Sequence, residues 1–484
     1  MAQISMKIPI ETGSVLGETQ HYFPFGDLES WTEATISGGS DYTRQYDSDG
    51  RLTSHRDGSV NRQLAYDAAS RITASVDSGV GGTANWTYSY DDQDRLTGAT
   101  NAATTGATSG TNQSFAYDAT GNRTSATNSG VTTNYVPDGQ SNRLTQVGGA
   151  ARSYDAAGNT TDWVGPIGAI NASYSARNRL AQTQTVAPLA SYAYDAWGER
   201  VGKQGAGYTQ FVYDEDGHLQ GEYDQAGRLI EETLWLDDTP VATLKLRAGA
   251  ADGSAIGGGS ATPWQGLPAG GVEAFWIESD QLDTPRAIVN QTHQLIWQWD
   301  SDPFGTTLPN QTPSVGQGIA TAFAYNLRFP GQYFDAETQT HYNYFRDYDP
   351  ATGRYVESDP AGLGDGPNTY TYVKGRPISA FDFDGLAFTP RTPYKRPPNS
   401  TTPDQRKKVQ GKPCHECGAV TQNQRADHPT PLVQEYFETG TIDIARMRDP
   451  NTVLPHCPAC SNRQGGFMAA YSKRMWKLIC GGER

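Results

Sequence analysis

Short runs of alternating apolar and polar residues recur along the first half of the chain, and most of them end in a tyrosine, as in TYSY at 87–90. A period of two predicts a half-buried β-strand. The tyrosine is followed by Asp-x-x-Gly or a similar turn segment, and then by an Arg-Leu pair that begins the next run. Each copy therefore predicts a strand, a turn and a second strand. The copies are YDSDGRL at 46, YDAASRI at 66, YDDQDRL at 90, YDATGNR at 117, YDAAGNT at 154, YSARNRL at 174, YDAWGER at 194, YDEDGHL at 213 and YDQAGRL at 223.

Successive tyrosines of this phrase are commonly 19 or 20 residues apart, so the phrase is an internal repeat. A hairpin of this size has too little apolar surface to be stable alone, and neighbouring copies must pair edge to edge. The pattern therefore predicts a mainly β body in which a long sheet coils. The Gly-, Ala- and Ser-rich segment 247–272 is interpreted as a loop inside that body.

Composition adds that this is a soluble chain with enough apolar residues to form a core. Of its 484 residues 36% are hydrophobic, and the mean hydropathy is −0.63. The first twenty residues lack a cationic segment followed by an apolar run, and no window reaches the roughly 18 apolar residues of a membrane-spanning helix. If such a chain leaves its cell, we expect a dedicated export machine to carry it.

Charge divides the chain at about residue 386. Residues 387–484 hold 15 Lys and Arg against 8 Asp and Glu, a net charge of +7, whereas residues 1–386 carry −22. Because neutralisation of phosphates by Lys and Arg supplies most non-specific nucleic-acid affinity, the division indicates that only the tail meets a polyanion. A solvated basic surface is the alternative interpretation. The segment 389–408 is rich in proline and basic residues and predicts a linker.

All five cysteines lie after residue 413, so no disulfide framework holds the body together. Cys414-x-x-Cys417 and Cys457-x-x-Cys460 form two knuckles that satisfy a closed, tetrahedral zinc site. A site of four thiolates has no open position for substrate, and the Zn²⁺ is therefore expected to be structural. Cys480 is left over and is expected to be buried.

The tyrosine-aspartate repeats resemble those of the rearrangement-hotspot (Rhs/YD) family. The resemblance covers about residues 40–386 and continues in order and spacing through DQLDTPRAIVN (280–290), WQWDSDPFG (297–305), the long segment 327–363 and NTYTYVKGRPISAFDFDGL (368–386). It implies a hollow β-shell that encloses a variable C-terminal toxin and cuts itself after the leucine of a final DPxGL motif.

Two elements of this chain resemble that motif. DPAGL at 359–363 fits it, whereas DFDGL at 382–386 has phenylalanine where proline is usual. The resemblance predicts cleavage between Leu386 and Ala387. Shells of this family are usually much longer, which leaves either a fragment or a partly closed shell.

Asp382 and Asp384 are the candidate catalytic residues for this cleavage. Two close carboxylates can share a proton, so that one activates water while the other protonates the leaving amide. Asp359 is a weaker third candidate. The structural alternative is that Asp-x-Asp-Gly forms an ordinary turn.

The order CxxC, Asp427-His428, CxxC, Asn462 resembles the HNH nucleases of the endonuclease VII type, in which a β-hairpin and a helix surround a metal ion. The resemblance implies that His428 is the general base, since a histidine exchanges its proton near neutral pH. Asp427 and Asn462 would then supply oxygen ligands to a catalytic Mg²⁺ or a similar divalent cation. In that family a metal ligand commonly follows the last zinc cysteine directly, where this chain has Ser461.

The rest of the tail is assigned by its pattern. His415 and His456 lie beside zinc cysteines and could replace a ligand, although four cysteines make this unnecessary. A helix is predicted over 467–479, and its apolar stripe indicates core rather than contacts. The stripe is Phe467, Tyr471, Met475 and Leu478, and the basic residues largely off it, available to phosphate, are Lys473, Arg474 and Lys477.

The predicted fold class is a mainly β, coiled YD-repeat shell followed by a small α+β, zinc-stabilised ββα-metal domain. The predicted parts are an N-terminal segment (1–39), the shell (40–310), the Rhs-associated core with the cleavage motif (311–386), a basic linker (387–410) and the nuclease domain (411–484).

The function that these two resemblances imply is an antibacterial toxin whose metal-dependent DNase acts in the cytoplasm of a target cell. Its expected partners are DNA, a cognate immunity protein and a VgrG- or PAAR-type component of a secretion apparatus, of which type VI is favoured. The sequence does not choose between DNA and RNA. The first alternative is a zinc-ribbon module that binds nucleic acid without catalysis, and the second is a purely structural surface protein of YD repeats.

Overall fold

The computed structural model describes residues 20–22, 28–33, 40–78, 82–246, 272–313, 322–386, 389–390, 400–433, 435 and 442–463. These residues belong to two compact units, Met1–Ala387 and Phe388–Arg484. Several predictions lie outside the described residues. They are the loop 247–272 except its last residue, the position of Ala387, the helix 467–479 and the burial of Cys480.

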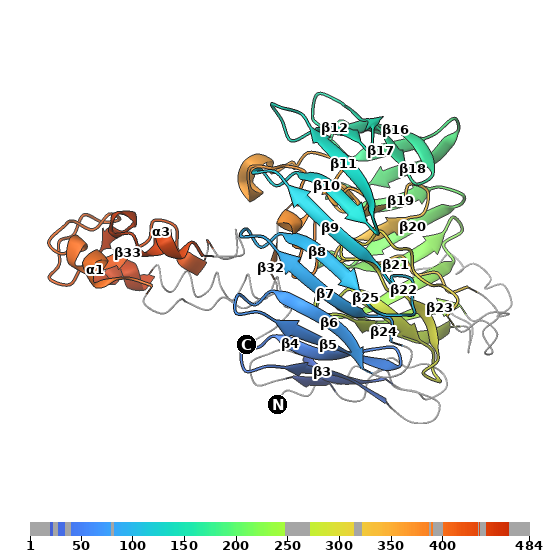
Figure 1. Cartoon of the computed structure of the whole chain (residues 1–484), viewed down its shortest axis with the longest axis horizontal. Helices are drawn as coiled ribbons and strands as arrows, with labels where there is room; N and C mark the ends of the chain where they lie inside the picture. Colours follow the sequence, from blue (N-terminus) through green and yellow to red (C-terminus); the bar gives the residue numbers. More distant parts are fainter. Residues whose placement is uncertain are drawn as a thin grey trace, which may run out of the picture. The chain divides into compact units, whose positions relative to one another are not determined.

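Among the described residues, thirteen antiparallel strands form the first sheet of the N-terminal unit, and they pair in chain order (Figure 1). Consecutive antiparallel strands need only short turns between them. The strands are β1 (Gln20–Tyr22), β2 (Leu28–Glu33), β3 (Ser40–Tyr46), β4 (Leu52–Asp57), β5 (Val60–Tyr66), β6 (Ile72–Ser78), β7 (Asn85–Tyr90), β8 (Leu96–Asn101), β9 (Asn112–Tyr117), β10 (Arg123–Asn128), β11 (Val131–Pro137), β12 (Leu144–Val147) and β13 (Ala150–Ala151). The sheet therefore begins before residue 40, where the repeat pattern places its start.

A second sheet of thirteen described strands continues the same course, again paired in chain order. In Figure 1 the labelled strands β3 to β12 ascend one side of this unit, and β16 to β24 descend the other. The strands are β14 (Ser153–Tyr154), β15 (Thr160–Gly165), β16 (Gly168–Tyr174), β17 (Leu180–Gln184), β18 (Pro188–Tyr194), β19 (Arg200–Gln204), β20 (Tyr208–Tyr213), β21 (Leu219–Asp224), β22 (Leu229–Leu236), β23 (Thr239–Leu246), β24 (Val272–Ser279), β25 (Pro285–Val289) and β26 (Leu295–Gln298).

The first strands of the first sheet meet the last strands of the second. Arg44 of β3 forms a buried ion pair of 2.8 Å with Asp283, which follows β24. Arg56 of β4 forms another, of 2.7 Å, with Glu278 in β24. The unit is therefore mainly β, as predicted, and its two sheets are joined at this end by side-chain contacts.

The repeated tyrosine ties each repeat to the one before it. Its hydroxyl donates a hydrogen bond to the backbone carbonyl of the residue that begins an earlier strand. This bond gives the buried hydroxyl a partner, which it would otherwise lack. The bonds run from Tyr66 to Leu52 (2.6 Å), from Tyr117 to Leu96 (2.8 Å), from Tyr174 to Thr160 (2.7 Å), from Tyr194 to Leu180 (2.9 Å) and from Tyr213 to Arg200 (3.1 Å).

The aspartate and the arginine of the repeat shape the turn between strands. Asp67 Oδ1 accepts hydrogen bonds from the backbone N–H groups of Ala69 (2.9 Å) and Arg71 (3.0 Å), and its Oδ2 accepts from Arg71 Nε at 2.7 Å. The same Arg71 guanidinium lies 5.1 Å from the ring centre of Tyr90 in the next repeat. A cation over an aromatic face contributes about 0.5–1 kcal/mol at exposed sites, so the turn of one repeat makes a stabilising contact with the tyrosine of the next.

The segment that follows the sheets packs against both of them. Its four-stranded sheet consists of β27 (Tyr333–Asp335), β28 (Thr340–Asn343), β29 (Arg346–Asp349) and β30 (Arg354–Tyr355), followed by η1 (Gly362–Asp365), η2 (Val373–Gly375) and β31 (Ala380–Phe381). Fully buried Arg200 of β19 forms ion pairs with Asp335 (2.6 Å) and Asp347 (3.0 Å). Arg354 donates to the side chain of Asn122 in the first sheet at 2.9 Å. Buried charges of this kind are tolerated only when they are paired.

The second unit is small and mixed. Its elements are α1 (Pro403–Val409), β33 (Arg425–Asp427), α3 (Ile444–Arg448), η3 (Pro450–Thr452), β34 (Leu454–His456) and a helical stretch at 458–463. The helix α1 lies inside the segment 387–410 that is predicted as a linker, and Thr402 and Gln405 form a capping box at its start. Gln405 is fully buried and donates to the carbonyl of Met447 at 2.7 Å. None of the helices in the described part of the chain has the length and hydropathy required of a membrane-spanning segment.

Candidate functional sites

The predicted cleavage motif, residues 382–386, is held against the buried sheet of the segment that follows the YD strands. The carbonyl oxygen of Asp382 accepts a hydrogen bond from Asn343 Nδ2 (2.8 Å), and that of Asp384 accepts from the N–H of Phe345 (2.9 Å). Gly385 has a φ of 75°, and a Cβ there would collide with the carbonyl oxygen of Asn343. Only glycine fits this approach without strain, so packing fixes the motif in one conformation.

Arg346 joins the two elements that resemble DPxGL. Its side chain is 2% exposed, and its Nη2 lies 3.1 Å from Asp359 Oδ2 and 3.2 Å from Asp382 Oδ2. Its Nε donates to the carbonyl of Gly385, and its guanidinium lies 3.7 Å from the ring centre of Tyr355. One cation therefore neutralises an aspartate from each element, which keeps both carboxylates in the interior.

The two predicted catalytic carboxylates converge on the N–H of Leu386. Asp382 Oδ1 accepts from the N–H groups of Gly385 (2.9 Å) and Leu386 (3.0 Å), and its Oδ2 accepts from Tyr355 Oη at 2.7 Å. Asp384 Oδ1 also accepts from the N–H of Leu386, at 3.0 Å. Burial, and after it the charge of Asp382, raises the pKa of Asp384 to about 6. Asp384 therefore holds a proton at a pH where an ordinary carboxyl is ionised.

Phe383 anchors the motif at the position where proline is usual in the family that this segment resembles. Its ring packs edge-on against His218 (5.4 Å between ring centres) and stacks on Tyr344 (6.2 Å). His218 is itself held between Asp214 (3.0 Å) and Asp238 (3.1 Å). The aromatic side chain thus attaches the motif to the second sheet.

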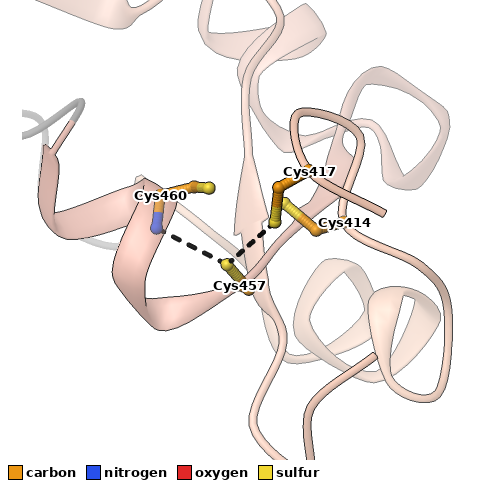
Figure 2. Close-up of side chains that lie close together, drawn as sticks. All are labelled: Cys414, Cys417, Cys457 and Cys460. Carbon is orange, nitrogen blue, oxygen red and sulfur yellow. Dashed lines mark hydrogen bonds between the residues drawn. The ribbon is translucent and has the colours of Figure 1, made fainter. Parts of the chain in front are cut away.

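The four cysteines of the two knuckles come together in the second unit (Figure 2). Their sulfur atoms all lie within 4.8 Å of one another, and Cys417 Sγ is 3.6 Å from Cys457 Sγ. A tetrahedral zinc ion with Zn–S bonds of about 2.3 Å requires sulfur atoms about 3.8 Å apart, so the cluster fits zinc.

The surroundings of the cysteines favour a bound cation. Burial disfavours the Cys414 thiolate, but hydrogen bonds from the backbone of Cys457, Cys417 and Glu416 outweigh it and lower the pKa of Cys414 to about 6. Burial, and after it hydrogen bonds with the other thiols, raises the pKa of Cys460. Several thiolates can coexist here when a metal ion neutralises them.

The strand pair β33 and β34 places Asp427 beside two histidines. Asp427 pairs with Leu454 across the ladder, so His456 is its diagonal neighbour on the same face. Asp427 Oδ2 lies 3.1 Å from His456 Nδ1 and 3.7 Å from His415 Nε2. The N–H of His415 donates to the carbonyl of Pro455 at 2.8 Å, which holds the first knuckle against β34.

The predicted base and the predicted amide ligand lie in other contacts. His428 is 8% exposed, and its Nε2 lies 2.9 Å from the carbonyl oxygen of Met447. Asn462 directs its Oδ1 to Arg425 Nη1 at 2.6 Å. In this structure the Asn462 amide oxygen thus lies against a guanidinium, whereas Asp427 lies beside His456 and His415.

His415 and His456 lie next to Asp427, a neighbourhood that the sequence pattern did not indicate. Both stand next to zinc cysteines, in CHEC and PHCPAC. Four cysteines made further ligands unnecessary, and nothing in one sequence shows that β33 and β34 pair in the register that brings Asp427 to them. The adjacency of histidine to both knuckles was the available signal.

Comparison with known proteins finds similarity in the YD-repeat segment of the chain. Residues 63–230 match the family model described as Teneurin YD-shell. The protein named Toxin protein Tse5, from Pseudomonas aeruginosa, is 29% identical over 401 residues, which are 76% of this chain and 28% of that protein. The protein named Probable deoxyribonuclease RhsB, from Dickeya dadantii, is 31% identical over 200 residues, 40% of this chain and 12% of that protein. The chain thus spans little more than a quarter of the first relative and a smaller part of the second.

Among solved structures, the crystal structure of TcdB2-TccC3 without its hypervariable C-terminal region has the same fold. It superposes with a TM-score of 0.58 over 77% of this chain and 19% of that one, at 18% sequence identity. The strand course and these matches together show that residues 63–230 are similar to a YD-shell and that the chain resembles proteins named as a toxin and as a deoxyribonuclease.

Proposed function

We propose that this chain is an Rhs-type antibacterial toxin whose β-shell cuts the chain after Leu386 and releases a metal-dependent endonuclease of the HNH type, residues 411–484. The observation that carries the proposal is that Asp427-His428 stands at the end of β33, and that its partner strand β34 leads directly into Cys457 of a zinc-compatible four-cysteine cluster. The relatives named as a toxin and as a deoxyribonuclease support the class of activity.

The convergence of Asp382 and Asp384 at Leu386 supports self-cleavage. One carboxylate takes a proton from a water molecule, whose oxygen attacks the carbonyl carbon of Leu386. The protonated carboxyl donates its proton to the amide nitrogen of Ala387 as the C–N bond breaks. The products are a carboxylate at Leu386 and an amine at Ala387. The raised pKa of Asp384 makes it the donor.

The intact mass of the purified chain tests self-cleavage. We expect two fragments with a boundary after Leu386, and a single uncut chain for Asp384→Asn and Asp382→Asn. A matched control is Asp216→Asn, an exposed turn aspartate of a YD repeat, which should be cut like the parent chain. An uncut parent chain, or a cut Asp384→Asn chain, would refute this part of the proposal.

The hydrogen bond of His428 supports its role as general base. Only an N–H can face the Met447 carbonyl, so Nε2 carries the hydrogen and Nδ1 carries the lone pair that can accept a proton from water. Asp427 would help to hold a divalent cation, which would stabilise the charge that develops on the phosphate. The net charge of +7 of residues 387–484 favours a polyanionic substrate.

A plasmid-nicking assay with the full chain tests the nuclease. Supercoiled DNA should be nicked in the presence of Mg²⁺ or Mn²⁺, and His428→Ala should abolish nicking while the zinc content stays at one ion for the four cysteines. Gln422→Ala, at an exposed position of the same unit, is the control and should retain activity. Loss of zinc together with activity would assign His428 a structural role.

A second candidate function is a zinc-stabilised module that binds nucleic acid without cutting it. The burial of His428 favours it, because a base must reach a water molecule. Supercoils that persist with Mg²⁺ and with Mn²⁺, combined with a gel shift of the DNA, would establish this function instead.

The proposed toxin function requires an immunity protein and a delivery apparatus as partners. A producer of such a nuclease needs an immunity protein that blocks it. We propose a secretion apparatus with a VgrG- or PAAR-type component for delivery, and the cytoplasm of a target cell as the place of action. Co-purification of the chain with the product of a neighbouring reading frame, with loss of nicking in that complex, tests the first partner.

A further inference from the structure

Two buried polar atoms face each other beside the four-cysteine cluster. His456 Nδ1 and Asp427 Oδ2 are 3.1 Å apart. Both atoms are inaccessible to solvent, and neither makes a hydrogen bond with any described residue. A buried polar atom without a partner destabilises the fold. Because the pair is close but lacks the alignment of a hydrogen bond, a proton on Nδ1 would not be aimed at the carboxylate.

The second nitrogen of His456 settles what Nδ1 presents. His456 Nε2 lies 2.9 Å from Glu416 Oε2, and a carboxylate oxygen only accepts. Nε2 therefore carries a hydrogen, and Nδ1 is the ring nitrogen left to coordinate a cation. A cation bound between Nδ1 and the carboxylate oxygen would satisfy both atoms.

A third donor completes the set on the accessible side. His415 Nε2 lies 3.7 Å from Asp427 Oδ2, and its side chain is 31% exposed. One ligand atom from each of His415, Asp427 and His456 lies within 4.8 Å of the other two. Ligands about 2.0–2.1 Å from a tetrahedral ion are about 3.3 Å apart, a spacing that the two measured distances bracket.

We propose that His415, Asp427 and His456 form a second divalent-cation site, separate from the four-cysteine site. Two imidazoles and one carboxylate suit Zn²⁺, Co²⁺ or Mn²⁺ better than Mg²⁺, which prefers oxygen ligands. Glu416 stands behind His456 as the carboxylate that orients a histidine ligand, and Arg463 holds Glu416 at 2.6 Å.

This site changes the expected composition of the nuclease centre. Asp427 remains a ligand, but His415 and His456 take the place that the sequence pattern gives to Asn462. The catalytic meaning of the site rests on the proposed nuclease function, whereas metal binding alone tests its existence.

A cobalt titration of the metal-free full chain tests the site. We expect two equivalents of Co²⁺ per chain. The intense sulfur-to-cobalt charge-transfer band should accompany one equivalent, and only weaker bands should accompany the other. Uptake of a single equivalent would overturn the proposal and leave His456 and Asp427 as an ion pair.

Single substitutions identify the ligands. His415→Gln, at the more exposed position, and Asp427→Asn should each bind one equivalent and keep the sulfur band. Asn462→Ala is the control and should still bind two. If Asn462→Ala loses the second equivalent while His415→Gln keeps it, Asn462 is the ligand and the proposal fails. Glu416→Gln should weaken the second equivalent about 10- to 100-fold, the usual effect of removing a carboxylate behind a histidine ligand.

One measurement needs no variant and so does not depend on a variant folding. With Zn²⁺ in the cysteine site and Mn²⁺ added, pulsed electron paramagnetic resonance should detect ¹⁴N coupling from directly bound imidazole. A bound Mn²⁺ without this coupling would overturn the proposal. Two equivalents without DNA cleavage would refute only the nuclease function, and cleavage with one equivalent would refute only this site.

Discussion

Arg346→Gln is expected to destabilise the shell strongly. The substitution removes the cation that faces Asp359 and Asp382, both of which are buried. Removing one partner of a buried ion pair costs about 3–5 kcal/mol. In the variant, Asp382 keeps the hydrogen bonds from Tyr355 and from the Leu386 N–H. The carbonyl of Gly385 loses the hydrogen bond that Arg346 donates. We therefore expect a loss of about 3–5 kcal/mol rather than twice that amount.

Guanidinium denaturation followed by tryptophan fluorescence measures this loss. Nine of the ten tryptophans precede residue 387, so the signal reports the shell. With the steep denaturant dependence of a unit of this size, the midpoint should fall by about 0.5–1 M. Arg228→Gln is the matched control, because its pair with Asp224 lies at the surface, where ion pairs contribute little. A midpoint for Arg346→Gln as close to the parent as that of Arg228→Gln would refute the reasoning.

Three further predictions concern other sites. Burial and the charge of Asp382 raise the pKa of Asp384 to about 6, so self-cleavage that uses protonated Asp384 should slow about tenfold per pH unit above pH 6. The test is to dilute the uncut chain from denaturant into buffers of pH 5 to 8 and measure the cleavage rate. A rate that does not change with pH would contradict the prediction. Burial, and after it Glu231, raises the pKa of Glu222 from 4.5 to about 8. Glu222 ionises less readily in the folded state than in the unfolded state, so the stability of the shell should fall as pH rises from 4.5 to 8. In thermal unfolding, Glu222→Gln should reduce this fall in the unfolding temperature. Equal slopes of unfolding temperature against pH for the two chains would count against the prediction. Cys457→Ser should make residues 400–463 sensitive to protease, because the four-cysteine cluster stabilises this unit. The fluorescence transition of the shell should stay unchanged, because the two units are separate. If residues 400–463 of the variant resist protease as well as those of the parent chain, the cysteines do not stabilise the unit.

The repeat pattern was sufficient for the architecture of the first unit. Each YD copy carries its own turn chemistry, as the Asp67–Arg71 pair shows, and its own link to an earlier strand, as the Tyr66 hydroxyl shows. These contacts join residues a few positions or one repeat apart. A mainly β, sequentially paired sheet could therefore be predicted from local spacing alone.

The functional sites depended on contacts between distant segments. Arg346 meets Asp359 and Asp382 only because the four-stranded sheet and the end of the shell pack together, and no local signal in the sequence indicates this arginine. The helix at 403–409 lies in a proline-rich stretch. Its capping box of Thr402 and Gln405 is a local signal that the linker prediction overlooked, whereas its burial against Met447 comes from packing.

By itself, the sequence determined the sequential pairing of the strands and the presence of two CxxC pairs, since both rest on residue type and short spacing. The choice of Asp382, Asp384, Asp427 and His428 came from the family resemblances. Only the tertiary structure decided which side chains share a site. The pairing of β33 with β34 sets His456 and His415 against Asp427 and leaves Asn462 with Arg425. The physical reason is that the register of the β33–β34 ladder and the burial around it decide which side chains meet. These two strands lie about thirty residues apart in a part of the chain without a repeat, so no pattern in the sequence indicates their pairing.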